Sequence, residues 1–120
     1  MKIVFADDMI YNRILLIEIF KKLEVDFVGF DDGKKVFDYL SIHPADVVFL
    51  DIEMPVMNGL ETATAIKNDL KLTIPVVSFT AHFTEEIAEK MKEVGFDYIL
   101  YKPFTSENVK TILDDIRSKN

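Results

Sequence analysis

Five short apolar runs alternate with five longer amphipathic stretches along the 120 residues of the chain. Regular alternation of strands and helices is typical of a parallel sheet with helices on both faces and right-handed crossovers. The pattern therefore predicts an α/β, doubly wound fold, with one domain over residues 1–120. The predicted strands cover 2–6, 25–30, 46–51, 74–79 and 97–101, and the predicted helices cover about 9–23, 33–42, 59–69, 84–94 and 105–118.

Local signals mark several helix ends. Thr84 precedes two acidic residues and predicts an N-cap, because its hydroxyl can accept a free backbone N–H of the first turn. Gly95 predicts a left-handed C-cap of the same helix. Either Thr105 or Ser106 is expected to cap the last helix.

Composition excludes several classes of function. The formal net charge is -7 and no cluster of Lys and Arg interrupts it, which argues against direct binding of nucleic acid. Cysteine is absent, so disulfides and thiolate metal sites are excluded. No apolar run approaches the roughly 20 residues that a membrane span needs. The first apolar run is too short for a signal peptide, so we expect a cytoplasmic protein. We also expect the chain to be a monomer or a weak dimer.

Charged and hydroxyl side chains stand where the predicted strands end. Asp7 and Asp8 follow the first apolar run, Asp51 follows the third, Thr80 follows the fourth and Lys102 follows the last. Because open parallel sheets bind ligands at the carboxyl ends of their strands, we expect these side chains to meet at one edge. A carboxylate after four buried residues costs free energy unless it is paired, and Lys102 is the expected partner of Asp51.

These residue types suit phosphoryl transfer. An aspartate carboxylate can attack a phosphoryl group and form an acyl phosphate. The charge that develops on the phosphoryl oxygens then needs a divalent cation, an ammonium and a hydroxyl donor. Carboxylate oxygens are suitable ligands for Mg²⁺. The pair Asp7-Asp8 could equally cap a helix that begins at Met9-Ile10, and the sequence leaves both roles open.

Four segments together resemble a known family along the whole chain. The sequence resembles the receiver domains of two-component response regulators, chemotaxis regulators included, and Asn12-Arg13 resembles receivers that work with hybrid histidine kinases. The stretch that begins at Asp51 is the most specific of the four. The matching segments are Phe5-Ala6-Asp7-Asp8, Phe49-Leu50-Asp51-Ile52-Glu53-Met54-Pro55-Val56-Met57-Asn58-Gly59, Phe79-Thr80-Ala81 and Tyr101-Lys102-Pro103-Phe104.

The resemblance implies a flavodoxin-like fold with strand order 2-1-3-4-5. It also implies that Asp51 accepts a phosphoryl group from the phosphohistidine of a histidine kinase or a histidine phosphotransfer protein. By the same resemblance, Asp8 and Asp51 bind Mg²⁺ directly, Asp7 binds it through water, and the backbone carbonyl of Glu53 is a further ligand.

The resemblance further implies that Thr80 and Lys102 contact the phosphoryl oxygens and that Lys102-Pro103 is a cis peptide. The expected output surface is the face made by the fourth helix, the fifth strand and the fifth helix. Family members usually carry Tyr or Phe three residues before the lysine, where this chain has Ile99. Thr80 is expected to move toward the phosphoryl group and to vacate space behind it. Ile99 has no ring to swing into that space, so Tyr101, on the same side of the strand, is the candidate switch residue.

Three further residues stand near the expected site. Phe83 is the expected neighbour of Tyr101. Glu53 and His82 are expected to flank the path of an attacking water and to set the lifetime of the acyl phosphate.

Other functions are possible for the same residues. One is a Mg²⁺-dependent aspartyl-phosphate hydrolase of the haloacid dehalogenase type, although such enzymes place their acid pair after the first strand. Another is a pseudo-receiver that binds partners without phosphorylation, although no site residue is missing. A flavin carrier would need a phosphate-binding loop after the first strand. The leading prediction is a switch that catalyses only its own phosphorylation and dephosphorylation, with its downstream target left open.

Overall fold

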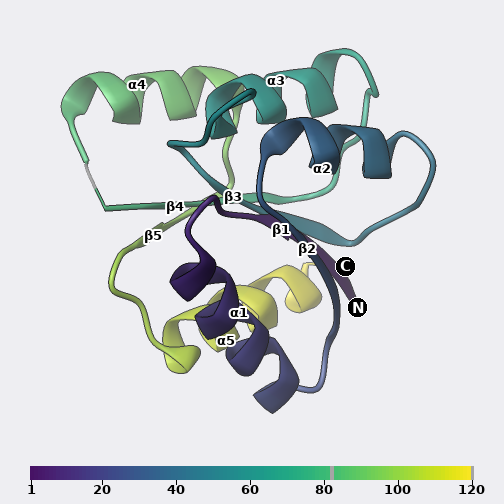
Figure 1. Cartoon of the computed structure of the whole chain (residues 1–120), viewed down its shortest axis with the longest axis vertical. Coiled ribbons are helices and arrows are strands. Elements are labelled where there is room, and N and C mark those ends of the chain that lie inside the picture. The colour runs from purple at the N-terminus through teal and green to yellow at the C-terminus, as the bar shows by residue number, and fades with distance from the viewer. Residues whose placement is uncertain (82, 120) are drawn as a thin grey trace.

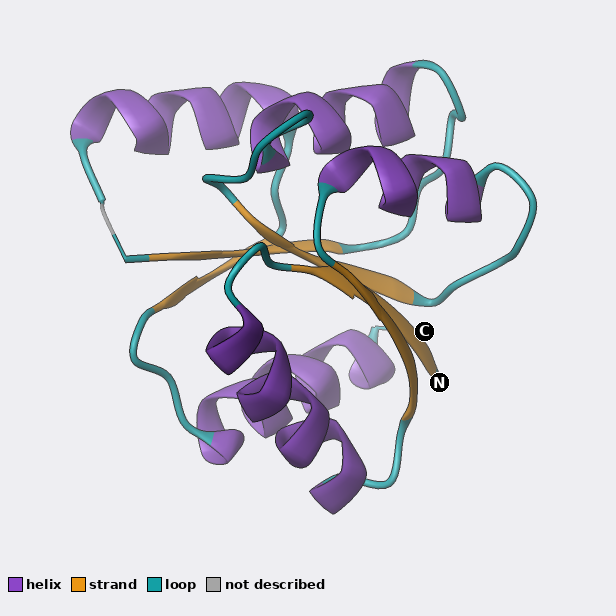
Figure 2. Cartoon of the chain, in the orientation of Figure 1, coloured by secondary structure: helices purple, strands orange, loops and turns teal. Residues whose placement is uncertain are grey.

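The computed structural model describes residues 1–81 and 83–119, which form a five-stranded parallel sheet between two layers of helices (Figures 1 and 2). The strand order β2-β1-β3-β4-β5 confirms the predicted doubly wound topology. The elements in chain order are β1 (Lys2–Ala6), α1 (Ile10–Lys22), β2 (Asp26–Phe30), α2 (Gly33–Leu40), β3 (Val47–Asp51), α3 (Gly59–Asn68), β4 (Val76–Thr80), α4 (Glu85–Val94), β5 (Tyr98–Tyr101) and α5 (Ser106–Ser118).

The two helical layers cover opposite faces of the sheet, with α1 and α5 below it and α2, α3 and α4 above it in Figure 1. All five residues of β3 and of β4 are buried, as expected for strands covered on both faces. Side chains alternate between the layers along each strand: Phe49 packs in the core toward α1 and α5, and Leu50 packs in the core toward α2 and α3.

Aromatic rings fill the core between the sheet and helices α1 and α5. The Phe20 ring lies 5.5 Å from the rings of Phe5 and Phe49, and the Phe79 ring lies 5.9 Å from that of Phe104, each distance measured between centroids. Such tilted and edge-on pairs add to the free energy of burying the rings. These five phenylalanines are therefore buried core residues.

Helix ends follow the predicted capping signals. The Thr84 side chain accepts the Ile87 N–H, and Gly95 ends α4 with a left-handed φ of 93°. Thr105, rather than Ser106, caps α5. The fourth strand differs from its prediction: it begins at Val76, two residues later, and it includes Thr80.

A glycine brings α3 against the end of β3. A Cβ atom on Gly59 would lie 2.3 Å from the carbonyl oxygen of Asp51, so only glycine fits there without displacement. The Gly59 N–H donates to the carbonyl of Ile52, and Asn58 with Glu61 forms a capping box at the start of α3. These contacts hold the backbone around Asp51 in place.

No helix among the described residues is long and apolar enough to cross a membrane. The cis peptide between Lys102 and Pro103 agrees with the expectation from the sequence.

Candidate functional site

A cleft of about 700 Å³ opens at the carboxyl-terminal edge of the sheet. Its walls come from the loops after β1, β3, β4 and β5, as open parallel sheets require of a ligand site. The predicted residues Asp8, Asp51, Glu53, Thr80 and Lys102 all line it. The other lining residues are Met9, Asn12, Ile52, Met54, Asn58, Leu60, Ala81 and Ile87.

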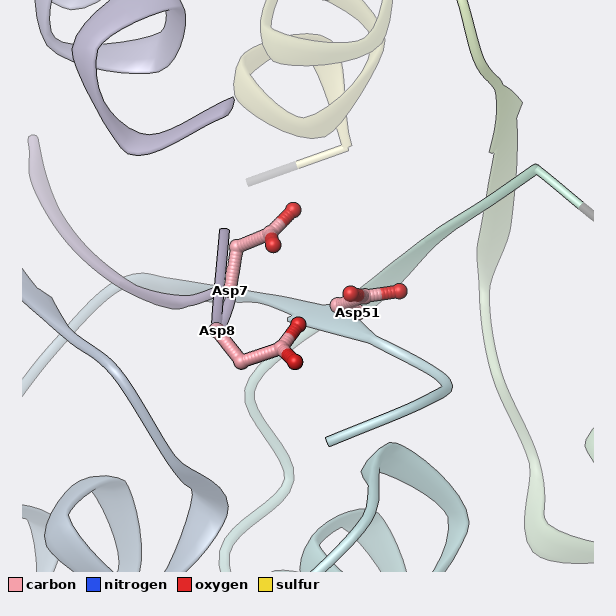
Figure 3. Close-up of side chains that lie close together, drawn as sticks. All are labelled: Asp7, Asp8 and Asp51. Carbon is pink, nitrogen blue, oxygen red and sulfur yellow. The ribbon is translucent and has the colours of Figure 1, made fainter. Parts of the chain in front are cut away.

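Three carboxylates meet at the base of this cleft. Figure 3 shows Asp7, Asp8 and Asp51 gathered where β1 and β3 end. One carboxylate oxygen from each lies within 4.8 Å of the other two. Asp7 is fully buried, Asp51 is 5 % exposed, and Asp8 is exposed. The sequence predicted this convergence, but it did not distinguish the buried carboxylate from the exposed one.

Lys102 pairs with two of these carboxylates. Its Nζ donates to Asp7 Oδ2 at 3.0 Å and lies 3.4 Å from Asp51 Oδ2. The ammonium also lies 5.3 Å from the centroid of the Phe79 ring. The sequence paired Lys102 with Asp51 alone, whereas the folded chain places it between two carboxylates and closer to Asp7.

Burial and, after it, the neighbouring Asp7 carboxylate raise the pKa of Asp51 to about 7, while Lys102 opposes the shift. The Glu53 N–H also points at Asp51 Oδ1, but at 3.4 Å it is a long hydrogen bond. The Asp51 carboxylate is therefore held in a position where its negative charge is costly until another cation arrives.

Asp7 serves the start of α1 as well as the site. Its Oδ1 accepts the Met9 N–H at 2.9 Å, and its backbone carbonyl accepts Arg13 Nη1 at 2.9 Å. Met9 is the N-cap residue of α1 and its side chain makes no capping hydrogen bond. The sequence left open whether this acid pair caps a helix or belongs to the site. In the structure, Asp7 binds the backbone before α1, and Asp8 projects into the cleft.

The predicted switch residues lie on neighbouring strands. Thr80 is buried and pairs in register with Tyr101, while Ser78 pairs with Ile99. The Tyr101 ring is half exposed and stands edge-on to Phe83, with centroids 5.3 Å apart. The structure thus places Phe83 beside Tyr101, as the sequence indicated.

Glu53 has an exposed side chain at the mouth of the cleft. His82, its predicted counterpart, lies outside the described residues.

The donor set of the cleft fits Mg²⁺. All three converging side chains offer carboxylate oxygens, the ligand type that Mg²⁺ prefers, and the part of the chain that the structure describes brings no thiolate or imidazole to this cluster. One ammonium faces three carboxylates, which leaves an excess of negative charge for a divalent cation to neutralise.

Residues 3–114 match the family model of the response regulator receiver domain. The chain belongs to this family. It is 37 % identical over 107 residues to stress response regulator protein 1 of Meyerozyma guilliermondii, covering 86 % of this chain and 49 % of the relative. It is 34 % identical over 113 residues to the sensor histidine kinase RcsC of Salmonella typhi, covering 94 % of this chain and 12 % of the kinase.

The fold also matches a solved receiver structure. The chemotaxis response regulator CheY4 of Vibrio cholerae superimposes with a TM-score of 0.86 and 25 % identity, covering 96 % of this chain and 97 % of that one. The chain thus spans less than half the length of the two curated relatives and nearly all of this chemotaxis regulator.

Family membership shows a phosphoacceptor receiver of two-component signalling, rather than a haloacid dehalogenase-type hydrolase. Receivers of this family interact with histidine kinases or histidine phosphotransfer proteins.

Proposed function

We propose that Asp51 is the residue that accepts the phosphoryl group. The observation that carries this proposal is its position: Asp51 ends β3 at the base of the cleft, next to the buried Asp7 and 3.4 Å from Lys102 Nζ. Asp8 is the third acid of the cluster, but it is exposed on the loop before α1. A nucleophile held by a buried strand is better oriented than one on an exposed loop.

The transfer reaction is a displacement at phosphorus. A lone pair of an Asp51 carboxylate oxygen forms the new P–O bond, and the P–N bond of a donor phosphohistidine breaks, leaving its electron pair on the imidazole. The product is an acyl phosphate on Asp51. Because attack requires the ionised carboxylate, the raised pKa of Asp51 makes a nearby cation important for the reaction.

We assign the Mg²⁺ ligands to the carboxylates of Asp8 and Asp51 and to the backbone carbonyl of Glu53, with Asp7 one water further away. Bound Mg²⁺ would offset the charge that develops on the phosphoryl oxygens. The same charge would favour the ionised form of Asp51.

Lys102 and Thr80 are the proposed partners of the phosphoryl oxygens after transfer. Lys102 Nζ already lies 3.4 Å from Asp51 Oδ2, so it can follow the new negative charge with little movement. Thr80 lines the same cleft. Movement of Thr80 toward the phosphoryl group would change the packing of Tyr101, its register partner on β5.

The output surface is then the face formed by α4, β5 and α5. Tyr101 and Phe83 take the role of the aromatic that Ile99 cannot fill, because an isoleucine has no ring to reorient. Coupling energies of such switches are typically about 1–3 kcal/mol, which biases partner binding about 5–150-fold.

Glu53 is the proposed control on the lifetime of the acyl phosphate, because its exposed side chain stands at the mouth of the cleft. A carboxylate there can orient or repel an attacking water. We further propose that residues 1–120 act as one receiver unit, monomeric or weakly dimeric, that turns over no external metabolite.

The test is phosphorylation by a small donor. Incubation with phosphoramidate and Mg²⁺ should add one phosphoryl group to the chain, measured by intact mass. Asp51→Asn should abolish the addition. Asp46→Asn is the matched control, since it makes the same change at an exposed acid outside the cleft. Equal labelling of the Asp51 and Asp46 variants would refute the assignment.

A further inference from the structure

Asp8 is the least constrained of the three carboxylates at the base of the cleft (Figure 3). Its side chain is exposed, whereas those of Asp7 and Asp51 are buried and pair with Lys102. Within the part of the chain that the structure describes, no hydrogen bond or ion pair holds the Asp8 carboxylate. A metal ligand must nevertheless be directed at its ion, so the direction of Asp8 has to come from its backbone.

Two hydrogen bonds fix the backbone on either side of Asp8. The carbonyl of the Asp7-Asp8 peptide accepts Nη1 of Arg13 at 2.9 Å. The N–H of the Asp8-Met9 peptide donates to Asp7 Oδ1, also at 2.9 Å. The backbone of Asp8 can turn only about the two bonds that join its Cα atom to these planar peptide groups. Holding both peptides therefore sets the direction in which the Asp8 side chain leaves the backbone.

Arg13 reaches the Asp7 carbonyl from the beginning of α1. It is the only charged residue between positions 9 and 17. Its own backbone N–H donates to the carbonyl of Met9, so the arginine is tied at both ends to the loop that carries Asp8. Its guanidinium makes no ion pair with any carboxylate among the described residues, so the hydrogen bond to Asp7 is its distinctive contact.

Charge compensation is a rival role for Arg13. A hydrogen bond from Lys35 lowers the pKa of Asp31, which follows β2, and the charge of Arg13 adds a smaller effect in the same direction. A positive charge that acts only through space would oppose the binding of a divalent cation in the cleft. The two roles therefore predict opposite results. Loss of Arg13 weakens metal binding if the residue orients Asp8, and strengthens it if the residue acts through charge alone.

We infer that Arg13 is a positioning residue for the metal site, because its hydrogen bond to the Asp7 carbonyl holds the backbone of Asp8 so that the Asp8 carboxylate points into the cleft. This inference rests on the proposed function, in which Asp8 is a ligand of Mg²⁺. Arg13 is not among the residues that line the cleft. It therefore acts on phosphorylation through the affinity for Mg²⁺ and not through contact with the phosphoryl group.

The test compares Arg13→Met, which removes the charge and the donors, with Arg13→Lys, which keeps both. Arg117→Met is the matched control, because Arg117 lies on α5 outside the cleft and pairs with Asp114. The affinity of the unphosphorylated chain for Mg²⁺ is measured from amide chemical shifts at increasing Mg²⁺, and the free energy of unfolding without Mg²⁺ from urea denaturation. The rate of phosphorylation by phosphoramidate is measured over the same range of Mg²⁺. Arg13→Gln, whose side chain is too short to reach the carbonyl, replaces the Met variant if that variant does not fold.

We expect Arg13→Met to lower the affinity for Mg²⁺ about tenfold, as loss of a residue that orients a metal ligand does. Phosphorylation should then need about ten times more Mg²⁺ to reach half its maximal rate, while the rate at saturating Mg²⁺ stays within about twofold of the unmodified chain. Arg13→Lys should bind Mg²⁺ within about threefold of the unmodified chain, because an ammonium can donate a single hydrogen bond to the same carbonyl. Arg117→Met should change neither quantity. A residue that served only the stability of α1 would lower the free energy of unfolding without changing the affinity for Mg²⁺.

Three results would overturn the inference while leaving the proposed function intact. They are an unchanged or increased affinity of Arg13→Met for Mg²⁺, a loss of affinity that Arg13→Lys shares in full, and a lower phosphorylation rate that saturating Mg²⁺ does not restore. An increased affinity would assign Arg13 to charge compensation. In each of these cases Asp8→Ala should still weaken the binding of Mg²⁺. An Asp8→Ala variant that binds Mg²⁺ as tightly as the unmodified chain would instead refute the proposed metal site, and the inference with it.

Discussion

The aspartates at the amino-terminal edge of the sheet, where its strands begin, have different partners from those at the carboxyl-terminal edge, where its strands end. At the amino-terminal edge, Asp46 accepts the Lys2 N–H at 2.6 Å, and Asp97 accepts the Val76 N–H at 2.8 Å. Each of these residues precedes one strand and ties it to the start of its neighbour. At the carboxyl-terminal edge, Asp7, Asp8 and Asp51 face one another instead.

The direction of the strands explains this difference. A parallel sheet presents free N–H groups where its strands begin and free carbonyls where they end. Carboxylates at the amino-terminal edge therefore find donors in the backbone, and they stabilise the fold. Carboxylates at the other edge have Lys102 as a partner and, in the proposed function, a divalent cation as well, so the same residue type there carries a cost in stability.

The largest effect that we expect from the difference between the two edges is stabilisation of the fold by Mg²⁺. At a concentration about 100 times its Kd, Mg²⁺ should stabilise the fold by about 2.7 kcal/mol, which raises Tm by on the order of 10 °C. Asp8→Ala should remove most of the rise, and Asp46→Ala should not. Thermal unfolding with and without Mg²⁺ measures this, and a rise that survives in the Asp8 variant would place the ion elsewhere.

The same binding should depend on pH. Because burial holds the pKa of Asp51 near 7, Mg²⁺ must displace a proton at lower pH. We therefore expect the affinity for Mg²⁺ to be about tenfold lower at about pH 6 than at about pH 8.

Asp51→Asn should stabilise the metal-free chain, by about 2 kcal/mol near pH 8. Folding raises the pKa of Asp51 from 3.8 to about 7, so the folded chain keeps a proton that the unfolded chain releases. The stabilisation from that proton is complete below about pH 4 and is lost as the pH rises to about 7. The advantage of the Asn variant should therefore grow between those limits.

Urea unfolding at several pH values without Mg²⁺ measures this advantage. The prediction is wrong if the difference in the free energy of unfolding between the Asn variant and the unmodified chain is the same at every pH. Ionised Asp51 would then not destabilise the fold, and the two edges would not differ in the way described.

Asp97→Ala should change the free energy of unfolding in the opposite direction. It should destabilise the fold by about 1.5 kcal/mol, because the Val76 N–H loses a charged acceptor. Asp97→Asn keeps an acceptor and is the matched control, with most of the stability retained. Denaturant unfolding separates the two variants. An Ala variant as stable as the Asn variant would show that this hydrogen bond does not hold the edge.

The smallest effect concerns the loop after β3. Val56 has a left-handed φ of 68° and is 80 % exposed, while Met57 N–H donates to the Pro55 carbonyl at 2.7 Å. A β-branched residue is strained in this conformation. Val56→Asn should stabilise the fold by about 1 kcal/mol, because Asn tolerates it better.

Val56→Ala, which keeps a Cβ atom, is the control and should gain less. Both are measured by thermal unfolding. An Asn variant less stable than the Ala variant would mean that the exposed Val56 side chain makes a contact that outweighs the strain.

The sequence by itself determined the alternation of elements and the place of the candidate functional residues. Short apolar runs predict strands, and a charged residue directly after such a run must lie at its carboxyl end. Asp51, Thr80 and Lys102 were therefore predictable as neighbours before any coordinates were known. The helix cap at Thr84 was also predictable, and the cap of the last helix was predictable as Thr105 or Ser106, because capping depends on residues close in the chain.

Only the tertiary structure decided which partners these residues meet. Strand alternation does not say that Lys102 comes closer to Asp7 than to Asp51, because that distance depends on how β5 lies across the sheet from β1. The pairing of Asp97 with the start of β4 likewise joins residues 21 positions apart. Helix α1 carries apolar residues on both sides, and its sequence cannot tell the side that the sheet covers from the side left exposed. The side that is buried is determined by packing between segments distant in the chain, and the local periodicity of the helix does not predict it.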